Sequence, residues 1–566
     1  MKKKLEYKHL KTPWGESLTR TPWEVYPRPQ MRRASFFCLN GEWDFSADGV
    51  VDSAKITVPF APESLLSGIH GDMGKTPRLH YVKRFSLPKG FFAGEDRVLL
   101  HFGAVDQIAR VTLNGAFVGA HIGGYEAFFF DVTELLTDEN CLEVDVTDEL
   151  ESHVLPWGKQ KRDRGGMWYT PVSGIWQTVW IERVPKAYVE GLRIEVGLDF
   201  ARIKAYGVQN GEVSVTTPEG EIKAALQDGE ALIKVKKPRL WSPEDPYLYD
   251  FTLTTDQDSV SSYFALRTLK IEDVDGFSRI CLNGKPYFFH GLLDQGYFSD
   301  GIYTPAAPEA YEFDILSMKK LGFNMLRKHI KIEPEQFYYD CDRLGMIVFQ
   351  DMVNNGGYSF LRDTALPTVG MKRLNDKLLH RDPKTRAAFA DSMEKTVRRL
   401  FNHPCICYWT VFNEGWGQFE SAKMYEKMKA LDSSRIIDTA SGWFAGAPSD
   451  VESLHVYFKP VKMKAAQKPV VLSEFGGYSY KPEGHVFNPY KTYGYRFFKE
   501  RADFEDALIK LYEEEIIPLV KKGLCGAVYT QVSDVEDETN GLLSYDRRVL
   551  KVSEERMRTI AEKLKL

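Results

Sequence analysis

Residues 405–416 read Cys-Ile-Cys-Tyr-Trp-Thr-Val-Phe-Asn-Glu-Gly-Trp, an apolar run that ends at Glu414. Residues 470–477 read Val-Val-Leu-Ser-Glu-Phe-Gly-Gly, and this run ends in the same way at Glu474. Short apolar runs that alternate with helical stretches are typical of parallel strands buried beneath helices. We therefore expect two buried strands, each delivering a carboxylate at its carboxyl end.

Six further apolar runs lie after residue 280, at 288–290, 324–327, 347–350, 436–438, 453–456 and 526–529. Between the first two, Pro308 to Leu321 predicts a helix, because apolar residues recur there at spacings of three and four before Gly322. Strands that alternate with helices in this way predict a (β/α)8 TIM barrel. The active site of such a barrel lies at the carboxyl ends of its strands, where Glu414 and Glu474 are expected.

The earlier part of the chain consists of shorter alternating runs without a helical period. From about residue 35 to 183 they predict a jelly-roll β-sandwich, with Asn40-Gly41 and Asn114-Gly115 as hairpin turns. The following block, 187–270, has the size of an immunoglobulin-like β-sandwich. The expected domains are a jelly-roll β-sandwich at 1–185, which the family resemblance described below implies is sugar-binding-like, an immunoglobulin-like sandwich at 186–272 and a catalytic barrel at 273–566.

The composition argues against several classes of protein. Lys and Arg number 74 against 79 Asp and Glu, a formal net charge of −5, so no nucleic-acid partner is expected. Neither a signal peptide nor an apolar run of about 18 residues is visible, so we expect no export and no membrane association. The seven scattered cysteines favour a reducing, cytoplasmic compartment. Cys405 and Cys407 lack further ligands at suitable spacing, so packing is favoured over a metal, and no cofactor is expected.

Two carboxylates on one barrel mouth suit hydrolysis of a glycosidic bond with retention of configuration. One carboxylate attacks the anomeric carbon, while the other protonates the departing oxygen and later deprotonates water. The alternative is that Glu414 and Glu474 each pair with an arginine at a strand end and serve only the structure.

Further polar and aromatic residues near the strand ends are candidates for binding a sugar. Candidate partners of sugar hydroxyls are His290, Asp294, Gln295, Asp351 and His455. Arg327 and His329 are two apart, so they would share one side of an extended strand, either in the site or in support of it. Trp416 and Trp443 would stack on a sugar ring or fill the core. The stretch Trp157 to Trp168 is a candidate loop from the first sandwich to the barrel mouth, and Asn354 to Lys384 is a candidate lid.

Several motifs, found in order along most of the chain, resemble those of glycoside hydrolase family 2, which contains β-galactosidases, β-glucuronidases and β-mannosidases. In the first sandwich they are Tyr26-Pro-Arg-Pro-Gln30, Leu39-Asn-Gly-Glu-Trp43 and the run from Trp168 to Gln177. In the barrel they are Arg327-Lys-His329, the stretch from Cys341 to Met346, Asn413-Glu414 and Ser473-Glu-Phe-Gly476.

The resemblance implies roles for the residues that match. Glu414 would be the acid/base, Glu474 the nucleophile, and Asn413 the partner of the sugar 2-hydroxyl. A nucleophile must stay ionised, so it needs positive charge and hydrogen-bond donors around it. Arg327 is the candidate cation and Tyr457 the candidate donor.

The chain departs from the family after its eighth strand. β-Glucuronidases hold the substrate carboxylate with an Asn-x-Lys motif there, whereas this chain reads Thr539-Asn-Gly-Leu-Leu543, without lysine. A uronate without a cation would bring an unpaired charge into a partly dry site. The Trp-Asn pair that many members carry on strand 8 is replaced by Thr530-Gln531.

The interpretation favoured by the sequence is a retaining exo-β-glycosidase, specifically a β-galactosidase, acting on an oligosaccharide or glycoside. The alternatives within the family are a β-mannosidase or a β-glucuronidase. From another class, a non-catalytic carbohydrate-binding protein on the same scaffold stays open. The broad faces of three domains are compatible with a homo-oligomer.

Overall fold

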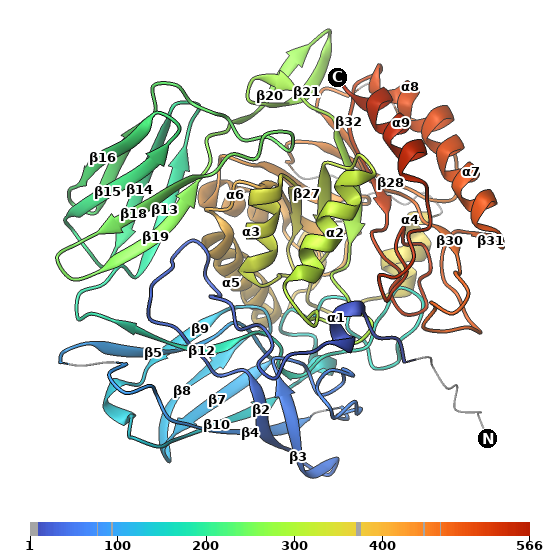
Figure 1. Cartoon of the computed structure of the whole chain (residues 1–566). Helices are drawn as coiled ribbons and strands as arrows, with labels where there is room; N and C mark the ends of the chain where they lie inside the picture. The colour runs from blue at the N-terminus through green and yellow to red at the C-terminus, as the bar shows by residue number, and fades with distance from the viewer. Residues whose placement is uncertain (1–8, 76, 92–93, 369–374, 445–447, 464–465) are drawn as a thin grey trace.

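The computed structural model describes residues 9–75, 77–91, 94–368, 375–444, 448–463 and 466–566. Two β-sandwiches and a barrel follow one another along the chain (Figure 1). In the view of Figure 1 the first sandwich lies below the barrel and the second lies to its left. This is the multidomain architecture that the sequence predicts. The limits proposed at residues 185 and 272 stay predictions.

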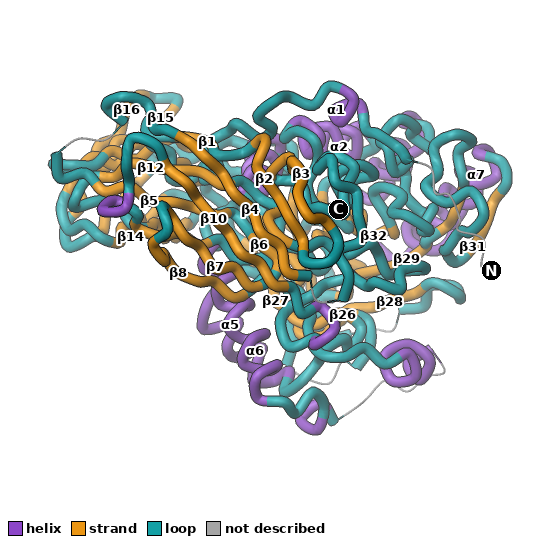
Figure 2. Tube along the Cα trace, turned by 90° about the horizontal axis from the view of Figure 1, so that it is seen from below, coloured by secondary structure: helices purple, strands orange, loops and turns teal. Residues whose placement is uncertain are grey.

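The first sandwich consists of antiparallel sheets around a core that includes Trp43, Phe45 and Tyr81. One sheet has the order β3 (Val51–Val58), β2 (Gly41–Ala47), β4 (Arg78–Phe85), β10 (Asn140–Thr147), β7 (Ile108–Leu113) and β8 (Ala116–Ile122), and Figure 2 shows these strands side by side. The other has the order β1 (Phe37–Cys38), β12 (Val179–Val184), β5 (Arg97–Phe102) and β9 (Phe128–Asp131). A small pair, β6 (Val105–Asp106) and β11 (Gly174–Ile175), completes it, and the short helix α1 (Pro13–Glu16) precedes it.

One of the two expected hairpins is confirmed and the other is wrong. Asn114 and Gly115 join β7 to β8, and both have the left-handed backbone conformation that a tight hairpin turn requires. Asn40 and Gly41 instead carry the chain from one sheet to the other, because β1 pairs with β12 while β2 pairs with β3 and β4. The Asn40 amide fixes this crossing: its Oδ1 accepts from the backbone N–H of Val179 at 3.0 Å.

The second sandwich packs two antiparallel sheets face to face around an apolar core. Their orders are β13 (Gly191–Val196), β14 (Phe200–Tyr206) and β17 (Glu230–Lys234), and β16 (Gly220–Leu226), β15 (Gly211–Thr217), β18 (Tyr249–Thr254) and β19 (Ser259–Phe264). A three-stranded sheet leads from there into the barrel, with β20 (Leu269–Val274), β21 (Phe277–Leu282) and β22 (Lys285–Pro286).

The barrel has eight parallel strands, all of them at the predicted places. The order is β27 (Ile436–Ser441), β26 (Ile406–Asn413), β25 (Ile347–Asp351), β24 (Met325–Lys328), β23 (Phe289–Asp294), β32 (Leu524–Thr530), β29 (Val470–Gly476) and β28 (Glu452–Val456). The outermost strands, β27 and β28, lie next to each other without a hydrogen-bonded ladder, so the barrel is nearly closed.

Helices cover the outside of the barrel. They are α2 (Glu309–Lys320), α3 (Glu335–Leu344), α4 (Leu366–Thr368), α5 (Pro383–Leu400), α6 (Ser421–Leu431), α7 (Arg501–Leu511), α8 (Ile517–Val520) and α9 (Glu554–Leu564), with a small pair of strands, β30 (Tyr478–Tyr480) and β31 (Arg496–Phe498). The helix predicted between Pro308 and Leu321 is α2, and its apolar residues are buried as expected. Among the described residues, every helix is too short or too polar to cross a membrane.

Candidate active site

Glu414 and Glu474 lie close together at the carboxyl ends of two barrel strands, β26 and β29. Glu474 belongs to β29, and Glu414 follows directly after β26 with a left-handed backbone, its N–H donating to the carbonyl of Ser441 at 2.9 Å. One oxygen of each carboxylate and a ring nitrogen of His455 all lie within 4.8 Å of one another. Carboxyl groups of a retaining glycosidase stand about 5–5.5 Å apart, so this separation suits retention rather than inversion.

His455, at the end of β28, stands between the two glutamates. Its Nδ1 lies 2.8 Å from Glu414 Oε1, and its Nε2 lies 3.6 Å from Glu474 Oε1 and 2.9 Å from the hydroxyl of Ser441. The imidazole is fully buried. It therefore orients Glu414 through a hydrogen bond and lies close to Glu474. Ser441 is a contact that sequence analysis missed, because a small hydroxyl residue at a strand end carries no distinguishing pattern.

The carboxylate of Glu474 is surrounded by donors. Arg327 Nη1 donates to its Oε1 at 3.0 Å, and the Tyr457 hydroxyl donates to its Oε2. Burial acts to raise the pKa of Glu474, but His455, Arg327 and His329 outweigh burial and, with the bond from Tyr457, lower this pKa to about 2. Glu474 is therefore ionised at neutral pH, as a nucleophile requires.

Arg327 is held in place by a carboxylate of its own. Its Nε and Nη2 donate to the two oxygens of Asp351, both at 3.0 Å, and His329 Nδ1 lies 2.8 Å from the same carboxylate. Burial acts to raise the pKa of Asp351, and Arg327 and His329 lower it below its usual value. Asp351 and His329 thus orient Arg327, and neither of them forms a hydrogen bond or ion pair with Glu414 or Glu474.

Asn413 points a donor into the same space. Its Oδ1 accepts from Arg327 Nη2 at 2.9 Å, whereas its Nδ2 is buried without a hydrogen-bond partner. The buried indole N–H groups of Trp416 and Trp443 also have no partner among the described residues, and Trp443 packs edge-on against His455 at 5.7 Å between ring centroids. Buried donors are almost always satisfied, so these three mark places where a ligand or water belongs. We name the group around Arg327, with Asp351, Asn413, Glu414, His455 and Glu474, the Arg327 cluster.

The structure does not bring every expected residue to the glutamates. Asp294 binds Lys328, whose Nζ lies 2.6 Å from Asp294 Oδ2 and 2.8 Å from Glu333 Oε1. Lys331 binds the other oxygen of Glu333 at 2.9 Å. We name these four residues the Lys328 cluster. Residues 327 and 328 are consecutive on β24 and point to opposite faces, so Asp294 lies with the cluster on the other face.

Two further candidates, Gln295 directly after β23 and His290 within it, have different surroundings. Gln295 is buried, its Nε2 has no partner among the described residues, and it forms no hydrogen bond with Glu414 or Glu474. His290 lies near the start of β23 instead of the mouth, between the carbonyl of Gly322 at 3.1 Å and the hydroxyl of Tyr512 at 3.2 Å. Its predicted place was wrong, because the strand extends four residues beyond it.

Strand β32 and the segment after it complete this end of the barrel. The hydroxyl of Thr530 lies 3.1 Å from that of Tyr457, so it supports the donor to Glu474. Gln531 Nε2 donates to Glu538 Oε2 at 2.8 Å and to Asn540 Oδ1 at 2.7 Å. The amide Nδ2 of Asn540 is buried without a partner.

A loop of the first sandwich reaches the barrel mouth, as the stretch Trp157 to Trp168 was expected to do. The Trp168 ring stacks on Trp157 at 5.3 Å and on Trp416 at 5.2 Å between ring centroids. Trp157 Nε1 donates to the carbonyl of Gly356 at 3.1 Å. Tyr358, in the predicted lid, packs edge-on against Trp168 and Trp416, while residues 369–374 of that segment lie outside the described residues.

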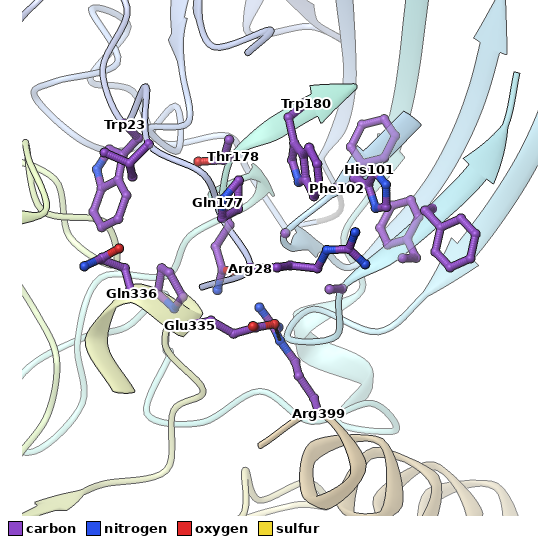
Figure 3. A pocket seen from close by; sticks show the side chains of 17 residues that line it. Trp23, Arg28, His101, Phe102, Gln177, Thr178, Trp180, Glu335, Gln336 and Arg399 are labelled. Carbon is purple, nitrogen blue, oxygen red and sulfur yellow. Dashed lines mark hydrogen bonds and ion pairs between the residues drawn. The ribbon is translucent and has the colours of Figure 1, made fainter. Parts of the chain in front are cut away.

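A separate cavity of about 110 Å³ lies between the first sandwich and helices α3 and α5 (Figure 3). Arg28 and Trp180 line it from the sandwich, and Glu335 and Arg399 line it from the helices. Neither glutamate of the barrel mouth lines this cavity. It is therefore distinct from the Arg327 cluster.

Comparison with known families and proteins agrees with this arrangement. Residues 273–558 match the profile "Glycosyl hydrolases family 2, TIM barrel domain", residues 189–267 match "Glycosyl hydrolases family 2", and residues 72–165 match "Glycosyl hydrolase 2 galactose-binding domain-like". The barrel match alone covers half of the chain.

Individual relatives carry two different names. The chain is 26% identical over 438 residues to a protein named β-galactosidase from Thermoanaerobacter pseudethanolicus, covering 70% of this chain and 54% of that relative. It is 27% identical over 451 residues to a protein named β-glucuronidase from Chlorocebus aethiops, covering 67% and 66%. The chain thus spans about half the length of the first relative. The solved structure of a β-D-glucuronidase from Dictyoglomus thermophilum has the same fold, with a TM-score of 0.73 at 18% identity over 95% of this chain and 98% of that one.

Proposed function

The chain belongs to glycosyl hydrolase family 2, and on that premise we propose that it is a retaining exo-β-glycosidase with Glu474 as nucleophile and Glu414 as acid/base. The observation that carries the proposal is the pair itself. A carboxylate with a pKa of about 2 stands within 4.8 Å of a second carboxylate, and a buried histidine lies beside both.

The geometry supports a double displacement. An oxygen of ionised Glu474 attacks the anomeric carbon while protonated Glu414 gives its proton to the glycosidic oxygen, so the aglycone leaves as an alcohol and a glycosyl ester forms. Glu414, now a carboxylate, takes a proton from water, and the resulting hydroxide attacks the anomeric carbon. The ester breaks, Glu474 regains its charge, and the sugar leaves with its original anomeric configuration.

The charges around the pair favour the transition state of this reaction. The anomeric centre becomes positive as the glycosidic bond breaks. With Glu414 protonated, the carboxylates of Asp351 and Glu474 face the single guanidinium of Arg327, so a developing positive charge meets an excess of negative charge. The free Nδ2 of Asn413 would donate to the sugar 2-hydroxyl, an interaction that strengthens in the transition state.

Three kinds of terminal sugar remain candidates. A β-galactoside is favoured by the name of the first relative and by the lack of lysine at 541–543. A β-glucuronide is favoured by the names of relatives such as that from Chlorocebus aethiops. A β-mannoside differs only in contacts around the ring hydroxyls and belongs in the same test.

The proposal is tested by screening the purified protein against the 4-nitrophenyl glycosides of β-galactose, β-glucuronic acid, β-mannose and β-glucose, with Glu474→Ala as control. Turnover of one β-glycoside with a dead control supports the class and the nucleophile together. If the folded protein cleaves none of these or their oligosaccharide counterparts yet binds the free sugars, the non-catalytic carbohydrate-binding alternative replaces the proposal.

A further inference from the structure

Lys159 is carried by the first sandwich but lies among residues of the barrel mouth. Its backbone is firmly placed, because the carbonyl of Lys159 accepts from Tyr169 N–H at 3.0 Å. Next to it, the buried Gln160 side chain donates to Asp106 at 3.0 Å and accepts from Val172 N–H at 2.7 Å. The position of the lysine is therefore set by the sandwich and not by its own side-chain contacts.

The ammonium group of Lys159 has no anionic partner within the described residues. The residue is 7% exposed, and its Nζ lies over the faces of two rings, 5.6 Å from the centroid of Tyr169 and 5.7 Å from that of Trp416. Burial of an unpaired charge is costly, so lysines are almost never buried without a partner.

The other buried lysines of the described chain show what the usual arrangement is. Lys328, Lys331 and Lys551 each have a carboxylate oxygen within 3.0 Å, at 2.6, 2.9 and 2.6 Å respectively. Lys159 alone among these four lacks one. An anion from outside the protein would pair with the ammonium group of Lys159 in the way that carboxylates pair with the other three lysines.

The neighbours of Lys159 place its charge near the barrel mouth. Trp416, under the ammonium, is two residues beyond Glu414 and carries a buried N–H without a partner. Burial lowers the pKa of His329 to about 4, and the positive charge of Lys159 contributes to that shift. On the other side, burial raises the pKa of Glu538 and Lys159 opposes the rise. Lys159 thus lies close enough to His329, which orients Arg327, and to Glu538, in the segment that follows β32, to act on both.

That segment offers a second donor. Gln531 joins Glu538 to the Oδ1 of Asn540, which leaves the buried Nδ2 of Asn540 unpaired. The sequence counted against a uronate because this segment contains no lysine. A cation delivered from the other domain to the same segment removes that objection.

We propose that Lys159 binds the carboxylate of a uronic acid at the non-reducing end of the substrate. A charge-assisted hydrogen bond between an ammonium and a carboxylate is among the stronger polar contacts available to a protein, and the apolar rings beneath Lys159 exclude competing water. The inference rests on the proposed glycosidase function and names its substrate class: a β-linked hexuronide.

The first test compares substrates that differ only at C6, the 4-nitrophenyl β-glucuronide with the β-glucoside and the β-galacturonide with the β-galactoside. Lys159→Met keeps the length and the apolar stem of the side chain but removes its charge. We expect kcat/KM on the preferred uronide to fall roughly 10- to 100-fold, with that on the matched neutral glycoside unchanged or higher. Lys161→Met, which removes an exposed lysine from the face of Trp168 in the same loop, should leave both values unchanged.

An equal loss on the uronide and the neutral glycoside would overturn the inference, because a merely structural lysine would affect both. So would an unchanged uronide rate in Lys159→Met. Thermal unfolding shows whether the variant is folded. If Lys159→Met fails to fold, Lys159→Gln and the charge-keeping Lys159→Arg supply the same comparison, with Arg expected to retain most of the uronide activity.

The second test does not depend on turnover. Calorimetry measures binding of free glucuronate, galacturonate, glucose and galactose to the intact protein and to Lys159→Met. Preferential uronate binding that is lost in the variant supports the inference even if no glycoside is cleaved, in which case only the proposed catalytic function fails. Equal binding of acids and neutral sugars would contradict the inference even if a glycoside is cleaved.

Discussion

The Arg327 cluster and the Lys328 cluster are centred on consecutive residues of one strand. They differ in how far their charges and hydrogen-bonding groups are paired within the protein. In the Lys328 cluster two ammonium groups face two carboxylates, and none of the described side-chain atoms of these four residues is buried without a partner. In the Arg327 cluster one guanidinium faces the two carboxylates of Asp351 and Glu474, and the Nδ2 of Asn413 has no partner among the described residues. The Lys328 cluster is therefore neutral, and we call it closed because its polar groups are paired. The Arg327 cluster is negative, and we call it open because it keeps an unpaired donor.

This difference separates structural from functional burial of charge. Both clusters contain buried ionisable groups at the mouth of a barrel, so burial and unusual pKa values alone would mark both as sites. What distinguishes the Arg327 cluster is the set of hydrogen-bond donors and the net charge that the protein itself leaves unmatched. By the same criterion Asp294 belongs to the structure, although its position after a barrel strand made it a candidate for the site.

The largest expected effect is the loss of kcat when the nucleophile proposed for the open cluster, Glu474, is removed. Glu474→Ala should lower kcat at least about 10⁴-fold on every substrate, because no other group can form the glycosyl ester. Steady-state kinetics on the preferred 4-nitrophenyl glycoside measures this. A variant that kept a hundredth of the activity would place the nucleophile elsewhere.

Removing the partner carboxylate should give a smaller and selective loss. Glu414→Ala is expected to lose roughly 10²- to 10⁴-fold on glycosides of poor leaving groups and much less on 2,4-dinitrophenyl glycosides, whose leaving group needs no proton. Added azide should restore turnover and yield a β-glycosyl azide. An α-azide product would contradict retention.

The matching change in the closed cluster should affect stability and not chemistry. Lys328→Met leaves the carboxylates of Asp294 and Glu333 with less compensation, so the free energy of unfolding should fall by roughly 3–5 kcal/mol. Urea denaturation measures the loss, and kcat of the folded fraction should stay close to that of the unchanged protein. A selective loss of kcat without destabilisation would contradict the claim that the Lys328 cluster serves only the structure.

The unpaired donor of the open cluster allows a sharper test. Asn413→Ala should lower kcat/KM roughly 10- to 100-fold on a substrate that carries the 2-hydroxyl. On the 2-deoxy analogue, which has nothing for Nδ2 to donate to, the variant and the unchanged protein should differ little. Equal losses on both substrates would mean that Asn413 acts only by holding Arg327.

The smallest expected effect concerns pH. Burial tends to raise the pKa of Glu474, and His455, Arg327, His329 and the Tyr457 hydroxyl together hold it near 2, so the nucleophile stays charged above about pH 3. Tyr457→Phe removes one of these lowering contributions, and the pKa of Glu474 should rise. Because only the charged form attacks, the acid limb of the kcat/KM profile should then move to higher pH. An acid limb that stays in place would show that another group governs it.

Most of the fold was accessible from the sequence because its signals are local. Eight apolar runs, the period of α2 and the turn at Asn114-Gly115 each reflect neighbouring residues, and the structure confirms them. The turn at Asn40-Gly41 has the same composition but joins two different sheets, since its environment is set by contacts with Pro22 and Val179 far along the chain.

The site was accessible only in part. The glutamates, Arg327 and Tyr457 stand at strand ends that the barrel necessarily brings together, and their grouping followed from strand positions. The closure of Asp294 by Lys328 could not be predicted, because it depends on which face of β24 each side chain occupies. The contact of Lys159 with Trp416 joins residues that are 257 positions apart and lie in two domains, so no local sequence pattern predicts it.

The stack of Trp157, Trp168 and Trp416 has a consequence for building chimaeras. A barrel transferred to a foreign amino-terminal sandwich would lose two of the three indoles and the lysine next to them, although every residue of the catalytic pair would be retained. The unit that can be exchanged between such proteins is therefore the barrel together with the loop that contains Trp157 and Trp168. Shuffling at domain borders would separate the machinery of the reaction from part of what selects its substrate.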